Sequence, residues 1–300
     1  MPTDRSYRVL AHELRVVASP RNLAFLHRFL APFEAEVGER ASVYEVRREP
    51  GERKPWAIYR DGRRLLRGSV APTVLEFALW DVSRMAIASD HGFLAVHAAA
   101  ASWQGRGIVL PAPPDSGKST LVAGLTRAGF SYLTDEAALI DPVTAELQPF
   151  PRSLWLERSS IEAVFGEDPA ARRWKTGVQF HVSPADLRTK AIGGPCAVRY
   201  VVAPTYQAGS ETALVPMSRA EAVVLLARSA FHLKRFGGAG IELLGRAVAG
   251  ADCFRATVGD LGEAVSRIQD LVAADHPAPG APVPEGATAA GTPARSGAHA

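Results

Sequence analysis

The first 90 residues alternate between strand-like and helix-like patterns of apolar side chains. Residues 7–19 alternate apolar and polar positions with the two-residue period of a strand. Pro20 is typical of a helix start, and residues 22–33 place apolar side chains at helical spacing. The chain is therefore expected to open with one strand followed by one helix.

Further strands and a second helix continue this N-terminal region. Strand-like runs occur at three places, residues 42–48, 56–59 and 64–68. Asp61-Gly62 separates the last two and is typical of a hairpin turn, while residues 73–88 return to the helical period. Residues 1–90 are thus interpreted as a small α+β region.

Beyond this region the sequence becomes more apolar and predicts an α/β domain over residues 91–275. Core strands are expected at residues 93–96, 107–110, 132–133, 138–140 and 199–203. Helices are expected at residues 121–128, 220–231 and 261–273. Residues 276–300 contain mainly Pro, Gly, Ala, Ser and Thr, which bury too little surface to offset chain entropy. This tail is predicted to be disordered.

Composition indicates a globular protein without a nucleic-acid partner. The 300 residues are 47% hydrophobic and 22% charged, and 34 basic against 31 acidic residues give a formal charge of only +3. No basic run is interleaved with aromatic residues, and no apolar run is long enough to span a membrane or serve as a signal peptide. Cys196 and Cys253 are too isolated for a zinc site and are expected to be buried thiols. We therefore expect a cytoplasmic protein.

The most informative segment is residues 107–120, GIVLPAPPDSGKST. It combines a buried strand, a loop and the first turn of a helix that continues to Gly129, a predicted C′ residue. A loop that holds phosphates needs backbone N–H groups, a lysine for the phosphate oxygens and a hydroxyl for Mg²⁺. Lys118 and Ser119 supply the last two. The expected nucleotide-binding residues are Pro113, Pro114, Asp115, Ser116, Gly117, Lys118, Ser119 and Thr120.

The loop departs from the usual G-x-x-x-x-G-K-[ST] pattern. Ala112 replaces the first glycine, and Pro113 and Pro114 have no N–H to donate. Phosphate donors would therefore come from residues 115–120, and Asp115 adds a carboxylate close to them. The alternative interpretation is an ordinary strand-to-helix turn with an exposed lysine.

Two adjacent acids follow the apolar pair Tyr132-Leu133. Phosphoryl transfer to a hydroxyl needs a group that accepts its proton and a cation that screens the phosphates. We expect Asp135 to be the base, and Glu136 to help with metal or water. Ser119 and Glu136 are accordingly the predicted Mg²⁺ ligands. The alternative is a solvated acidic turn between two strands.

His97 ends another apolar run and precedes four alanines, where small side chains allow close approach. A lone histidine in such a position is more often part of the core than catalytic. An additional cation is expected to stabilise the transferring phosphoryl group, and four residues have a fitting context: Arg152, Lys175, Lys234 and Arg235. For each of these, and for His181 and His232, a structural role is the simpler interpretation.

Three motifs together resemble the catalytic domain of HPr kinase/phosphorylase. They are V-H-A-A-A, P-A-P-P-D-S-G-K-S-T-L and A-G-F-S-Y-L-T-D-E, and the resemblance covers roughly residues 90–272. It is closer to the stand-alone HPr-kinase-related proteins of bacterial gene clusters, including those that phosphorylate precursor peptides in lasso-peptide pathways. The C-terminal signature that serves the reverse phosphorylase reaction has no counterpart, so neither that reaction nor HPr as substrate is expected.

The resemblance implies a fold and an activity. The fold is α/β, a P-loop nucleotide domain of the HPr kinase / phosphoenolpyruvate carboxykinase-like type, with the small α+β region before it. The activity is transfer of the γ-phosphoryl of ATP, with Mg²⁺, to a serine hydroxyl of a peptide or small protein. Asp135 would be the base, with His97 and Lys118 beside it as catalytic residues, and the family's assembly implies a homo-oligomer. A non-catalytic ATP-binding module and a kinase for a small hydroxylated metabolite remain alternatives.

Overall fold

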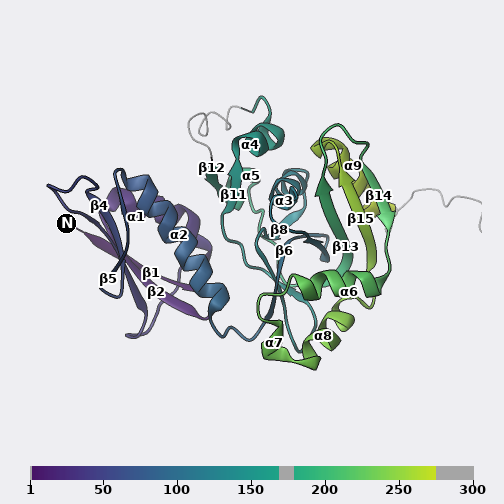
Figure 1. The fold of residues 1–300 in the computed structure, drawn as a ribbon, viewed down its shortest axis with the longest axis horizontal. Helices are drawn as coiled ribbons and strands as arrows, with labels where there is room; N and C mark the ends of the chain where they lie inside the picture. The colour runs from purple at the N-terminus through teal and green to yellow at the C-terminus, as the bar shows by residue number, and fades with distance from the viewer. Residues whose placement is uncertain (1, 169–178, 275–300) are drawn as a thin grey trace, which may run out of the picture.

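The computed structural model describes residues 2–168 and 179–274, which form two principal β-sheets and the helices packed on them (Figure 1). The tail predicted to be disordered lies outside these residues. No helix within the described residues is long and apolar enough to cross a membrane.

The N-terminal sheet has five strands in the order of the chain, β1-β2-β3-β4-β5. Their bounds are Thr3–Val9, His12–Ala18, Ser42–Arg48, Trp56–Arg60 and Arg63–Gly68. Two helices, α1 (Pro20–Leu30) and α2 (Ala71–Ala88), cover the side of the sheet that faces the remainder of the chain (Figure 1). The predicted helices and the hairpin at Asp61-Gly62 are confirmed, and both turn residues have positive φ (51° and 76°).

The single strand expected over residues 7–19 is wrong, because the chain turns back within it. β1 and β2 form a hairpin in which Val9 pairs with His12. The turn contains Leu10 and Ala11, and Leu10 adopts a positive φ of 54°. Leucine rarely adopts this conformation, so the sequence has no turn signal here, and the alternating pattern runs through the hairpin without interruption.

The second sheet is mixed and has eight strands. Its main path runs β10-β9-β6-β7-β13-β15-β14, and β8 pairs with β6. In that order the bounds are Leu147–Gln148, Ala137–Ile140, Leu94–Trp103, Arg106–Pro111, Ala197–Tyr206, Asp252–Val258 and Ala213–Pro216, with β8 at Ser131–Thr134. β7, β13 and β15 are parallel to one another, whereas β6 is antiparallel to β7, β8 and β9. The carboxyl ends of the three parallel strands therefore meet at one edge.

Helices cover both faces of this second sheet (Figure 1). On one face, α3 (Lys118–Arg127) packs beside α9 (Leu261–Ala274); on the other, α6 (Arg219–Arg228) packs beside α8 (Gly238–Val248). The expected helices α3, α6 and α9 are confirmed. α8, β14 and β15 were not predicted. α8 contains three glycines, which have poor helix propensity. β14 is only four residues long and ends at a proline, and β15 mixes polar with apolar residues.

A third, two-stranded sheet lies over the first turn of α3. β11 (Leu154–Glu157) pairs with β12 (Gln179–Val182), and α4 (Arg158–Phe165) and α5 (Pro184–Leu187) flank them. A short helix, α7 (Leu233–Phe236), precedes α8. Cys196 and Cys253 are buried free thiols, as expected.

The N-terminal helices pack directly behind the segment that carries the acid pair. Ala137, Leu139 and Phe150 belong to the same buried cluster as the apolar face of α1 and α2. Phe29 of α1 also packs on the buried His181, with ring centroids 5.6 Å apart. Arg28 donates to both carboxylate oxygens of Asp186 at 2.7 Å.

Protonation of His181 is expected to destabilise the fold. Burial, and then the charge of Arg152, lower the pKa of His181 from 6.5 to about 4. Between these values the unfolded chain binds more protons than the folded one, so stability falls as the pH falls. The total loss is about 3 kcal/mol from pH 6.5 to pH 4. In His181→Asn, the amide can still reach Ser153 but does not titrate. The decrease in unfolding free energy between pH 6.5 and pH 4, measured by urea unfolding, should therefore be smaller by this amount. Parallel pH profiles for the two proteins would contradict the assignment.

Candidate functional site

The loop between β7 and α3 has the backbone of an anion-binding site. Asp115 and Gly117 both adopt positive φ, 61° and 84°. Gly117 is the N-cap residue of α3, and no side chain caps this helix end. The N–H of Leu121 makes the first helical bond, to the Gly117 carbonyl, so the preceding N–H groups of the first turn remain available to a ligand.

Ser116 supplies a second, independent indication of a ligand. Its side chain is 9% exposed, and its hydroxyl has no hydrogen-bond partner. The Ser116 carbonyl accepts a 3.1 Å hydrogen bond from the N–H of Tyr206, which ties the loop to the end of β13. A buried hydroxyl without a partner costs free energy unless something binds it.

Lys118 lies beneath the loop and is only 6% exposed. Its Nζ donates to the carbonyl of Pro113 at 3.2 Å. Burial lowers the pKa of Lys118, while the negative charges of Glu136 and Asp135 oppose that shift. A buried cation with one carbonyl partner is well placed for an incoming anion.

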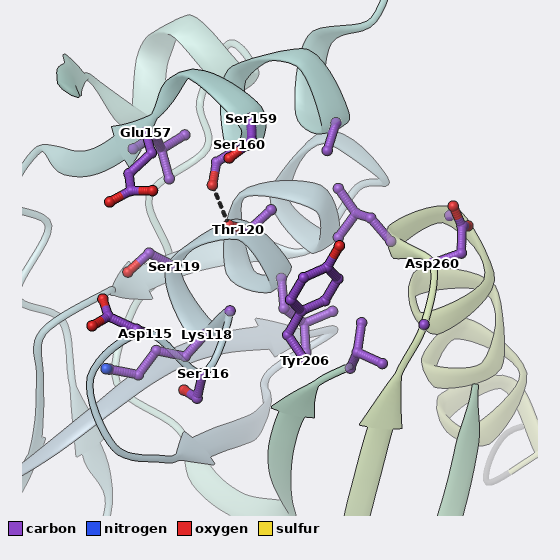
Figure 2. A pocket seen from close by; sticks show the side chains of 18 of the residues that line it. Asp115, Ser116, Lys118, Ser119, Thr120, Glu157, Ser159, Ser160, Tyr206 and Asp260 are labelled. Atoms are coloured by element: carbon purple, nitrogen blue, oxygen red, sulfur yellow. Dashed lines mark hydrogen bonds between the residues drawn. The ribbon is translucent and has the colours of Figure 1, made fainter. Parts of the chain in front are cut away.

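A cavity of about 730 Å³ opens in front of this loop. Figure 2 shows Ser116, Ser119 and Thr120 at its base, with Ser159 and Ser160 of α4 on the opposite wall. The Thr120 and Ser160 hydroxyls lie 2.7 Å apart and connect α3 to α4. The volume is within the range of small-ligand sites.

The acid pair forms a buried network with Arg152. Arg152 Nη1 donates to Glu136 Oε2 at 2.9 Å, and its Nε lies 3.5 Å from Asp135 Oδ1. The Tyr132 hydroxyl lies 3.2 Å from Asp135 Oδ1, and the N–H of Trp155 donates to Oδ2 at 3.4 Å. The acid pair is thus not a solvated turn, because Asp135 is only 4% exposed.

The two acids have different pKa values because their surroundings differ. Burial raises the pKa of Asp135, Arg152 opposes the rise, and the charge of Glu136 adds to it. Burial also acts on Glu136, but contacts with His97 and Arg152 lower its pKa to about 2. Asp135 is therefore the stronger base of the pair, and Glu136 remains a carboxylate at any physiological pH.

His97 belongs to the same network. Its Nδ1 lies 3.3 Å from Glu136 Oε1, and its ring makes an edge contact with Phe231 at 5.6 Å between centroids. The N–H of His97 also donates to the Ser229 carbonyl at 2.7 Å. The structure therefore brings His97, Asp135, Glu136 and Arg152 together, and the charge coupling of Lys118 to both acids connects this network to the loop.

Other predicted residues lie away from this arrangement. Pro113 and Pro114 do not line the cavity; they are exposed, and Pro113 contributes only the carbonyl that holds Lys118. Lys234 and Arg235 are exposed on α7, and Arg235 lines a different surface depression together with His232. His181 is buried against Ser153 and Trp155. Lys175 lies outside the described residues.

Sequence reasoning missed the parts of the cavity contributed by distant segments. Tyr206 lies at the end of β13, Asp260 lies between β15 and α9, and Leu261 is the first residue of α9. Each follows a strand that is parallel to β7, and this pairing carries no local sequence signal. Tyr132 was counted only as an apolar residue, although its hydroxyl contacts the base candidate.

The residues present fit a triphosphate and a magnesium ion. Free N–H groups, a buried hydroxyl and a buried lysine match an anion with several oxygens. Among the described residues, no cluster of three or more His, Cys, Asp or Glu side chains could hold a metal unaided. A Mg²⁺ ion here would take most of its ligands from phosphates and water, as is usual for that ion.

Comparisons with known proteins give only a weak likeness to solved structures. No protein-family model and no curated protein matches the sequence. Among solved structures, the Hpr(Ser) kinase/phosphatase from Coxiella burnetii matches with a TM-score of 0.31 and 10% sequence identity, over 60% of this chain and 95% of that chain. These values establish neither a shared fold nor a shared activity.

Removing Arg152 should destabilise the chain strongly, because the buried Asp135 and the half-buried Glu136 would lose their counter-charge. We expect Arg152→Met to lose about 3–5 kcal/mol of unfolding free energy at pH 7. The deficit should shrink towards pH 4, since the unpaired carboxylates then take up protons. The control is Arg28→Met, whose ion pair with Asp186 is partly exposed and should contribute about 1 kcal/mol or less. If Arg152→Met and Arg28→Met lost the same free energy of unfolding in urea, Arg152 would not be the main counter-charge of the two acids.

Proposed function

We propose that this protein is an ATP-dependent kinase that transfers the γ-phosphoryl group to a serine hydroxyl of a peptide or small protein. The observation that carries the proposal is the buried, unpartnered Ser116 hydroxyl at an uncapped helix N-terminus, with Lys118 linking the loop electrostatically to the acid pair. The resemblance of the three motifs to HPr kinase/phosphorylase supports the same reaction.

Asp135 is the proposed general base. The acceptor oxygen attacks the γ-phosphorus, the bond from that phosphorus to the β,γ-bridging oxygen breaks, and ADP leaves. The proton of the acceptor hydroxyl passes to Asp135. Its pKa, raised by burial, suits this task better than that of Glu136, which contacts with His97 and Arg152 lower to about 2.

The remaining residues stabilise charge and fix positions. Lys118 and the N–H groups of the first turn of α3 balance the phosphate charge. Ser119, together with Glu136 directly or through water, is the proposed metal-binding pair, and Mg²⁺ supplies neutralisation of the phosphate oxygens when bound. His97 contacts one carboxylate oxygen of Glu136 and Arg152 contacts the other, so the two residues fix the position of this side chain.

The acceptor is the least constrained part of the proposal. Similarity of the motifs to stand-alone relatives in peptide-modifying gene clusters favours a ribosomal precursor peptide. The same phosphate machinery would also serve a small hydroxylated metabolite. A homo-oligomer is proposed on the resemblance alone.

One observation favours a second candidate, a nucleotide-binding module without transfer. Asp135 is 4% exposed, and both its oxygens have protein neighbours. A kinase must bring the acceptor hydroxyl within about 3 Å of this carboxylate, which requires Trp155 or Tyr132 to shift. A binding module needs no such movement.

Asp135→Asn separates the two candidates. In a kinase this variant should keep ATP affinity within about threefold and lose at least about 100-fold in turnover, because only proton transfer is removed. Lys118→Ala should lose ATP affinity as well. The measurements are ATP titration with Mg²⁺ and mass spectrometry of serine-containing peptides encoded beside the gene. Unchanged phosphorylation in Asp135→Asn would refute its role as base, and ATP binding without any phosphorylated product would favour the binding module.

Removing the charge of Asp115 should strengthen ATP binding. Asp115 lies on the cavity wall, and its carboxylate is near enough to Lys118 to influence its pKa (Figure 2). Asn tolerates the same positive φ, so Asp115→Asn should leave the loop intact while removing repulsion of the phosphates. We expect affinity to rise about 2- to 5-fold at low salt, and less at high salt. The charge control is Glu242→Gln on α8, which should change nothing. Weaker ATP binding in Asp115→Asn would indicate that this carboxylate serves the metal.

A further inference from the structure

The order of the strands indicates how a nucleotide bound to the loop would be oriented. The parallel strands β7, β13 and β15 end at the same edge, where β7 leads into the phosphate loop. β6, which carries His97, lies on the other side of β7, and β8 and β9, which flank the acid pair, both pair with β6. A γ-phosphate on the β6 side would lie near the acids, and the nucleoside would then extend along the edge towards β13 and β15.

The residue at the end of β13 is an exposed aromatic. Tyr206 has 56% of its side chain exposed and lines the same cavity as Ser116 and Thr120. Figure 2 shows its ring standing in the cavity, between the first turn of α3 and the start of α9. An exposed tyrosine ring inside a cavity presents a flat apolar surface to a ligand.

The backbone fixes the position of Tyr206 next to the loop. Its N–H donates to Ser116, and an added Cβ at Gly117 would lie 3.2 Å from the Tyr206 Cβ. The Tyr206 side chain therefore starts directly beside the turn at Gly117. Four apolar residues, Leu121, Ala163, Val258 and Leu261, also line this cavity, together with the polar Ser159 and Ser160.

We infer that the Tyr206 ring stacks on the nucleobase of the bound nucleotide. This inference rests on the proposed function, since it assumes a triphosphate on the loop, and it assigns the opposite end of that ligand. The ring and these apolar residues recognise the face of a base rather than its edge, so adenine and guanine should bind with similar affinity. Asp260, directly before α9, is an acidic residue of the same lining, as are Asp115 and Glu157.

The test compares ligands with and without a base. ATP, GTP and inorganic tripolyphosphate, each with Mg²⁺, would be titrated calorimetrically into the wild type, Tyr206→Ala and Tyr206→Phe. Tyr206→Ala should weaken ATP and GTP about 5- to 150-fold, the range of a lost base-aromatic stack, and leave tripolyphosphate unchanged. Tyr206→Phe should bind all three within about twofold of the wild type, since the ring is retained. Trp80→Ala, which removes an exposed aromatic of α2, is the matched control.

Each other result overturns the inference in a distinct way. Equal losses for ATP and tripolyphosphate in Tyr206→Ala would mean that Tyr206 only supports the loop. Unchanged ATP binding in that variant would place the base elsewhere, and a GTP affinity more than tenfold different from that of ATP would contradict recognition by stacking. Failure of the folded wild type to bind either ATP or tripolyphosphate would refute the proposed function itself, and the base site with it.

Discussion

The site depends on one buried electrostatic arrangement, the pairing of Arg152 with Asp135 and Glu136. The Arg152 side chain is 11% exposed and that of Asp135 is 4% exposed, so neither charge can rely on water. Isolated, each would cost several kcal/mol to bury. Together they can be enclosed between the N-terminal helices and the mixed sheet, and the acid pair can be held on a short connection between β8 and β9.

The same network explains how two adjacent acids acquire different properties. Arg152 contacts both carboxylates, so its charge alone cannot distinguish them. Asp135 is enclosed and receives weak hydrogen bonds from Trp155 and Tyr132 at 3.2–3.4 Å. Glu136 receives a direct bond from Arg152 and faces His97 as well. Burial therefore dominates at Asp135, whereas contacts with His97 and Arg152 dominate at Glu136, and the pKa of Asp135 is raised while that of Glu136 is lowered.

Local sequence patterns predicted the elements better than the contacts between them. The strand, loop and helix around Lys118 could be predicted because a buried run, a turn and a helical period occur in consecutive residues. The hairpin at Leu10 could not, since a leucine at positive φ carries no turn signal. Nor could the position of Tyr206 be foreseen. It reaches the loop only through the parallel pairing of β7 with β13, and register between distant strands is decided by packing.

The loop between β7 and α3 shows how a turn with available N–H groups can form with few glycines. The bend needs positive φ at two positions, and only Gly117 meets it with a glycine. Asp115 adopts a φ of 61°, a conformation that Asp tolerates better than most residues. At Ala112 the side chain points into the protein and is 5% exposed, so a methyl group there occupies core space without obstructing the cavity. The loop substitutions therefore leave the backbone N–H groups of the turn in place, and the main electrostatic difference that they introduce is the carboxylate of Asp115.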